Sequence, residues 1–202
     1  MSRHQKGEIM VRRIGSKGLA ALVLALVLGL PGMAQGVDFD LSKLNYEVGV
    51  NFGYGKNYKK ANVQLFSLLP HWGLFLVRPG QQWGPFGVSF LVEGTLSLAS
   101  ATTTGFEVGI APLLKFSVLL FPGVMAHIEG GAGVISESIN SPALAQVFNF
   151  TPQAGAGFDI ALTPQLAFQV AYRFRHSSDA GIHEPNPSFN VNFFQAGLNY
   201  YY

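Results

Sequence analysis

The chain has 202 residues, of which 12% are charged and 13% are aromatic, and its formal net charge is +2. Ordinary soluble domains contain about 25% charged residues, so this composition argues against a soluble protein and favours strands that face lipid. The sequence contains no cysteine, which excludes a disulfide framework and thiolate chemistry.

The N-terminal segment has the pattern of a secretory signal peptide. Basic residues precede an apolar run at 19–30, and the small residues Gly32 and Ala34 occupy the positions of a cleavage site. A membrane anchor helix is the alternative, but a span needs about 20 apolar residues. We therefore predict a signal peptide at 1–34 and a single mature domain at 35–202.

Removal of the signal peptide reverses the sign of the charge. The segment contains five of the 13 Lys and Arg residues and one of the 11 Asp and Glu residues, so the remaining chain has a formal charge near −2. Without a basic surface to attract a phosphate backbone, we expect no nucleic-acid partner.

Strand-length segments separated by turn residues follow the signal peptide. At 46–54 bulky residues alternate with small or polar ones, which is the pattern of a strand with one face toward lipid. Pro112, inside the fourth segment, predicts a bulge or an edge irregularity. The predicted strands are 46–54, 62–71 with an extended continuation at 74–83, 86–97, 106–116, 124–135, 148–162, 165–175 and 190–202.

The number and length of these segments predict a small closed barrel. Strands of about 9–11 residues span a bilayer, and an even number closes the sheet so that no edge meets lipid. The terminal Tyr200-Tyr201-Tyr202 suits an interfacial aromatic girdle. A secreted β-sandwich or lipocalin-like barrel is the alternative, but its outward positions would carry more Lys and Glu. We predict an all-β fold, an eight-stranded antiparallel transmembrane β-barrel, whose interior is filled by side chains.

Two residues at the end of the seventh segment, His176 and Ser178, form a candidate catalytic pair. Successive side chains of a strand point to opposite faces, so these two share a face while Ser177 points away. An imidazole beside a hydroxyl is the arrangement that nucleophilic acyl transfer requires, because the ring accepts the proton as the oxygen attacks. A His-x-Ser pair alone, however, is usually a solvated strand end.

The segments 148–157, 172–176, 180–182 and 185–187 carry a pattern beyond this pair. Together they resemble the lipid A 3-O-deacylase family of outer-membrane barrels, and a looser similarity begins near residue 45. The resemblance implies a carboxylic ester hydrolase of the bacterial outer membrane that removes the 3-position acyl chain from lipid A of lipopolysaccharide. It implies no metal and no cofactor.

The family motif His-x-Ser-Asn-Ala-Gly supplies a base, a nucleophile and groups that hold the oxyanion, and a downstream acidic residue orients the histidine. By this resemblance His176 is the base, Ser178 the nucleophile and Gly181 an oxyanion residue. Asn190 falls where well-known members have a glutamate. Its side chain can still accept a hydrogen bond from the imidazole and fix its tautomer.

Asp179 is the second departure, because the family has asparagine after the serine. A carboxylate that faced the developing oxyanion would repel it. Asp179 is therefore expected to be protonated, to point elsewhere, or to orient His176 itself. We expect Asp179→Asn to raise the rate. A catalytically inactive barrel with a structural or surface-interaction role is the alternative function that Asp179 favours.

Other polar and aromatic residues receive structural interpretations. His127 and Glu129 share a strand face and are expected to make hydrogen bonds in the barrel interior rather than to bind a metal. Carboxylates within strands are expected to face the interior, because the lipid face penalises them. These carboxylates are Glu47, Glu93 and Glu107. The predicted interfacial anchors are Tyr46, His71, Trp72 and Trp83.

Overall fold

The computed structural model describes residues 37–57, 63–101, 104–139, 147–183 and 188–202. The predicted signal peptide at 1–34 lies outside these residues. Within the described part of the chain, no helix combines the length and the apolar character needed to cross a membrane.

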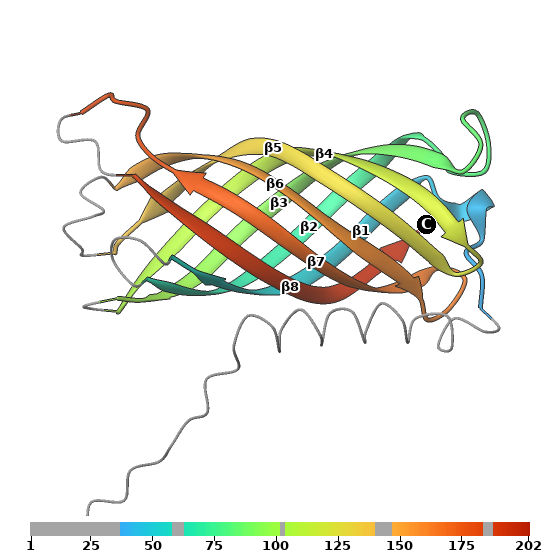
Figure 1. The fold of residues 1–202 in the computed structure, drawn as a ribbon, viewed down its shortest axis with the longest axis horizontal. Helices are drawn as coiled ribbons and strands as arrows, with labels where there is room; N and C mark the ends of the chain where they lie inside the picture. The colour runs from blue at the N-terminus through green and yellow to red at the C-terminus, as the bar shows by residue number, and fades with distance from the viewer. Residues whose placement is uncertain (1–36, 58–62, 102–103, 140–146, 184–187) are drawn as a thin grey trace, which may run out of the picture.

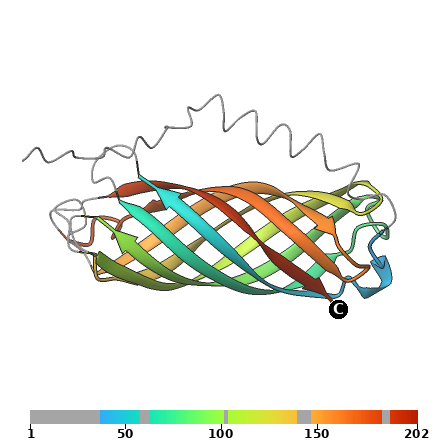
Figure 2. The same cartoon turned by 90° about the horizontal axis from the view of Figure 1, so that it is seen from below.

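Eight strands pair in sequence order, each antiparallel to its neighbours, and β1 pairs with β8 to close a barrel (Figures 1 and 2). The strands are β1 (Tyr46–Lys56), β2 (Gln64–Val77), β3 (Phe86–Ser100), β4 (Thr104–Phe121), β5 (Val124–Glu137), β6 (Phe148–Ala161), β7 (Leu166–Ser177) and β8 (Phe189–Tyr201). A short 3₁₀ helix, η1 (Leu41–Lys43), precedes β1. The predicted fold class is confirmed.

The second strand joins two segments that the sequence pattern separates. The run predicted at 62–71 and the first part of its extended continuation at 74–83 form one strand, because β2 runs from Gln64 to Val77. Pro70 has no N–H to donate, and the pairing of β2 with β3 is absent at residues 69–70 but resumes at His71 in the same register. A proline therefore interrupts the ladder on one side here without ending the strand.

Pro112 acts on β4 in the same way. Pairing with β5 stops after Ile110 and resumes at Leu113 without a change of register. The predicted irregularity is thus an interruption of hydrogen bonding, and the bulge of this strand lies elsewhere, between Leu119 and Phe121.

The two faces of the strands separate charge from apolar surface. All charged residues of the described strands are buried in the barrel interior except Lys56, which lies at the end of β1. The outer wall instead presents large apolar side chains, such as Phe52 and Leu98, which are 67% and 63% exposed. A soluble barrel would show the opposite arrangement, so this wall is the lipid-facing belt of a membrane barrel.

Aromatic side chains mark the end of the barrel that holds the C-terminus. The Tyr46 ring stacks on Trp72 with centroids 5.9 Å apart, and the indole Nε1 of Trp72 donates to the Tyr202 hydroxyl at 3.1 Å. These residues lie where interfacial anchors are found. The prediction that His71 is an anchor was wrong, because its ring is buried in the interior 3.3 Å from the amide oxygen of Asn199.

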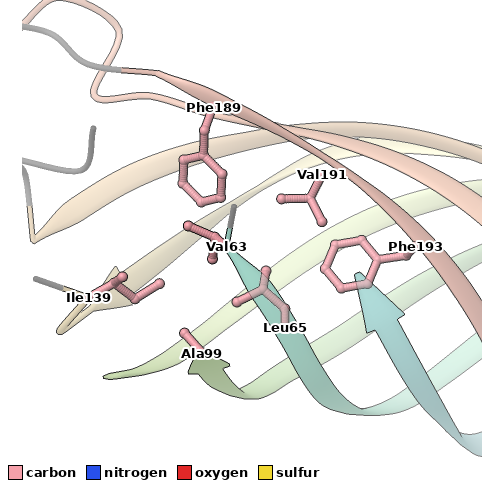
Figure 3. Packing of buried hydrophobic residues seen from close by; sticks show 7 residues of the cluster. All are labelled: Val63, Leu65, Ala99, Ile139, Phe189, Val191 and Phe193. Atoms are coloured by element: carbon pink, nitrogen blue, oxygen red, sulfur yellow. The ribbon is translucent and has the colours of Figure 1, made fainter. Parts of the chain in front are cut away.

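Side chains fill the barrel interior in three layers. At the end that holds the C-terminus, Phe39 and Leu44, which precede β1, pack against Tyr201. At the opposite end, Figure 3 shows an apolar cluster to which β8 contributes Phe189 and Phe193.

The middle layer is ionic: basic side chains lie between acidic ones from other strands. The predicted inward orientation of the three strand glutamates is confirmed. The ion pairs are Lys115–Glu47, Lys115–Asp159, Arg173–Glu93, Arg173–Glu129 and Arg175–Glu107.

Candidate active site

The candidate site lies where β7 ends, at the end of the barrel opposite the C-terminus (Figure 1). His176 and Ser178 face outward and are half-buried, whereas Ser177 and Asp179 point inward and are each only 1% exposed. The alternation of a strand therefore continues for two residues beyond the last residue of β7. It places the imidazole and the hydroxyl of the predicted pair on the lipid-facing wall.

His176 is paired across the strands with Asn190 of β8. The ring Nδ1 and the amide Oδ1 are 2.6 Å apart. With Nδ1–H donating to this oxygen, Nε2 carries the lone pair and is the basic atom of the ring. Asn190 thus makes the contact that sequence reasoning predicted for an orienting residue.

The backbone geometry explains why the side chains of His176 and Asn190 meet. Ser178 exchanges both backbone hydrogen bonds with Phe150 of β6, at 3.2 and 2.8 Å. Since the direction of backbone groups repeats every two residues, those of His176 also point toward β6. His176 and Asn190 consequently form a non-hydrogen-bonded pair between β7 and β8, the arrangement in which opposite side chains lie closest.

The surroundings of the pair on the outer wall are apolar. Pro152 of β6 lies opposite His176, because the β6–β7 pairing breaks after Gln153 and resumes at Phe150 in the same register. Phe150 and Phe174 are 37% and 40% exposed beside it. The imidazole, hydroxyl and carboxamide are therefore a small polar spot at the rim of an apolar surface.

Asp179 points away from this spot. One carboxylate oxygen accepts the Gly181 N–H at 3.0 Å, and the other accepts the His183 N–H at 2.9 Å and the His183 ring Nδ1 at 3.1 Å. Burial raises the pKa of Asp179, but the hydrogen bonds from His183 and Gly181 outweigh it and hold that pKa below its usual value. The carboxylate is thus ionised and engaged with the loop.

This placement selects among the alternatives that the sequence leaves open. Asp179 is ionised, and its side chain points inward, away from His176. Of the three alternatives, the one in which Asp179 points away from the oxyanion agrees with the structure. The reason to expect a faster Asp179→Asn variant is therefore removed. The N–H of Gly181 donates to Asp179, so the oxyanion role of Gly181 stays a prediction that this geometry does not support directly.

The other histidine–acid pair of the sequence makes contacts in the barrel interior, as predicted. The Nδ1 of His127 lies 2.8 Å from Asp159, and Glu129 accepts from Arg173 at 2.6 Å. Within the described residues, no group of three His, Asp or Glu side chains is arranged to hold a metal ion. Sequence reasoning missed the partners of these residues, although charged side chains at inward positions of a membrane strand signal such a network.

Comparison with known proteins assigns the family. A family model described as lipid A 3-O-deacylase (PagL) matches residues 37–199. The chain belongs to this family. As a member with an outer-membrane barrel fold, it is a protein of the bacterial outer membrane. No curated protein sequence matches the chain.

Solved structures show the same architecture. The crystal structure of the outer membrane enzyme PagL is 16% identical, covers 75% of this chain and 98% of its own, and has a TM-score of 0.59. The crystal structure of Neisserial surface protein A (NspA) is 12% identical, covers 78% of this chain and 97% of its own, and has a TM-score of 0.56. Both likenesses establish the fold, and neither distinguishes an enzyme from a surface protein.

Proposed function

We propose that this protein is a serine esterase that removes the 3-position acyl chain from lipid A. The observation that carries the proposal is the outward-facing His176, held by Asn190 at 2.6 Å, on the same strand face as Ser178. Membership in the PagL family supports lipid A as the substrate.

The reaction begins with Ser178 as the nucleophile. Nε2 of His176 takes the hydroxyl proton as Oγ attacks the carbonyl carbon of the acyl ester. Asn190 keeps the proton on Nδ1, so that Nε2 stays available as the base. The tetrahedral intermediate collapses when His176 returns the proton to the sugar oxygen, which leaves as an alcohol.

Hydrolysis of the acyl-enzyme completes the cycle. His176 takes a proton from water as the water oxygen attacks the acyl carbon, and the proton then returns to Ser178 Oγ as the fatty acid leaves. All steps use side chains of the protein, and the proposal requires no metal or cofactor.

The position of the pair suits a substrate that stays in the membrane. The links between strands are longer on average at the His176 end, where they are 57–63, 101–103, 138–147 and 178–188, than at the opposite end, where they are 78–85, 122–123 and 162–165. Outer-membrane barrels have short periplasmic turns and longer extracellular loops. The pair therefore lies at the level of the outer leaflet, where a lipid reaches the outer wall sideways.

Ser178→Ala tests the proposal, with Ser177→Ala as the matched control. Mass spectrometry should show that lipid A from cells expressing the wild type lacks one 3-linked acyl chain. Lipid A from cells expressing Ser178→Ala should retain this chain. Ser177 lies one residue away, but it points inward and its Oγ has no hydrogen-bond partner among the described residues, so Ser177→Ala should deacylate normally. Unchanged lipid A in all three strains would contradict the esterase function and favour a catalytically inactive barrel.

Asn190→Asp should raise kcat. A carboxylate stabilises the imidazolium that forms in the transition state, whereas the neutral amide fixes only the tautomer. We expect an increase of about tenfold, which corresponds to about 1.4 kcal/mol of added stabilisation. The measurement is steady-state hydrolysis of lipid A by purified protein.

Asn192→Asp is the control for this variant. Asn192 is the next outward residue of β8, but it accepts a hydrogen bond from Tyr172 at 2.5 Å rather than contacting His176. Equal increases in the two variants would show that added negative charge, and not the contact with His176, changes the rate.

A further inference from the structure

Three hydrogen-bond donors converge on the carboxylate of Asp179, the residue at which this chain departs from the family motif. They are the backbone N–H groups of Gly181 and His183 and the ring Nδ1 of His183, at 3.0, 2.9 and 3.1 Å. The carbonyl oxygen of Asp179 also accepts the N–H of Ile182 at 3.3 Å. Asp179 thus stabilises the first turn of the β7–β8 connection through its carboxylate and its backbone carbonyl.

The turn needs this support because its backbone is unusual. Ala180 has φ of 59° and Gly181 has φ of 79°. Among the described residues, Ala180 alone combines a side chain with positive φ, a conformation that is uncommon outside glycine. The bonds to the carboxylate offset the cost of the left-handed conformation at Ala180, since Gly181 adopts positive φ without a steric penalty.

The turn that Asp179 stabilises begins at Ser178. On one side Ser178 is anchored by its two backbone hydrogen bonds to Phe150. On the other side its peptide leads directly into Asp179, whose side chain is buried and bound to the loop. The serine is therefore held between an anchor on β6 and the turn fixed by Asp179.

We propose that Asp179 is a positioning residue, which fixes the backbone at Ser178, and hence keeps its hydroxyl on the same face as His176, by binding the N–H groups of Gly181 and His183. The inference rests on the proposed esterase function. It assigns the carboxylate a role that an asparagine cannot fill here, since an amide has one acceptor oxygen and its NH₂ would face another donor.

Asp179→Asn tests the proposal, because it keeps the shape of the side chain and removes one acceptor. Purified variant protein should show a kcat on lipid A lowered by about tenfold or more with KM within about twofold, as expected when a reacting group is misplaced rather than binding lost. Asp179→Glu keeps the acceptors and should recover part of the rate. His183→Ala removes only the ring donor and should lose less than Asp179→Asn.

Amide hydrogen exchange supplies a readout that does not depend on catalysis. Asp179→Asn should speed exchange at Gly181 and His183, both in the wild-type background and together with Ser178→Ala. Unchanged exchange, or faster exchange with kcat unchanged or raised, would overturn the positioning role. If the wild type itself lacks deacylase activity, the proposed function fails, and exchange in the Ser178→Ala background still reports whether Asp179 holds the turn.

Discussion

Replacing His176 with alanine is expected to lower kcat on lipid A by about a thousandfold or more, while KM stays within about threefold. Ser178 loses the base that takes its proton, but the apolar wall that contacts the lipid is unchanged. The side chain of His176 lies on the outer surface and bonds to Asn190, so the barrel should fold normally. Steady-state kinetics with purified protein in detergent micelles measures both constants.

His183→Ala is the comparison for the loss at His176, and it should lower kcat far less than His176→Ala, because it removes only one donor to Asp179. His183 is the other described histidine near the site, and its ring, although largely exposed, is bound to Asp179. Retention of more than about a hundredth of the wild-type kcat by His176→Ala would contradict its role as the base, because a general base contributes at least about a hundredfold.

Arg173→Met should lower the free energy of unfolding by about 3–5 kcal/mol, because it leaves buried carboxylates without their partner. The guanidinium is 3% exposed and binds Glu93 and Glu129 from two other strands. Its Nη2 donates to Glu93 at 2.9 Å and to Glu129 at 2.6 Å. Urea unfolding in lipid vesicles, followed by the fluorescence of Trp72 and Trp83, gives the free energy.

A neutral triple variant separates the ion pairs from the volume of the side chain. Arg173→Met combined with Glu93→Gln and Glu129→Gln removes the uncompensated charges and should recover most of the lost stability, since replacing a whole buried ion network by neutral groups is often tolerated. A single variant within about 1 kcal/mol of wild type, or a triple variant no better than the single one, would contradict this role.

The faces of the strands were predictable because alternation is a local property. Period-two spacing placed Glu47 and Glu93 in the interior and Tyr46 and Phe52 on the wall, and the structure agrees. The wrong interpretation of His71 arose from the strand end, since the run was expected to end at His71 although β2 continues past it to Val77.

Partners across the barrel interior were not predictable in this way. Arg173 meets Glu93 and Glu129 because the closed sheet brings β3, β5 and β7 to one level. That level depends on the register of every strand between them, which no single segment encodes. The contact of Lys115 with Glu47 and Asp159 has the same origin.

At the site, the same alternation could have been carried one residue further. It placed His176 and Ser178 outward and Ser177 inward, and it also predicts an inward Asp179. Because the predicted strand ends at residue 175, Asp179 was treated as a residue free to face the oxyanion. The bridge between Ser178 and Phe150 extends the strand geometry past that point, and only the structure reveals it.

The central claim is that His176 activates the outward-facing hydroxyl of Ser178, and covalent labelling tests it most directly. Purified protein is treated with a lipid-like fluorophosphonate, which reacts with activated serines, and the modified peptide is identified by mass spectrometry. The account predicts an adduct on Ser178 of the wild type that is lost in His176→Ala, with Ser177 unmodified. An adduct that forms equally in His176→Ala, or that maps to another residue, would contradict it.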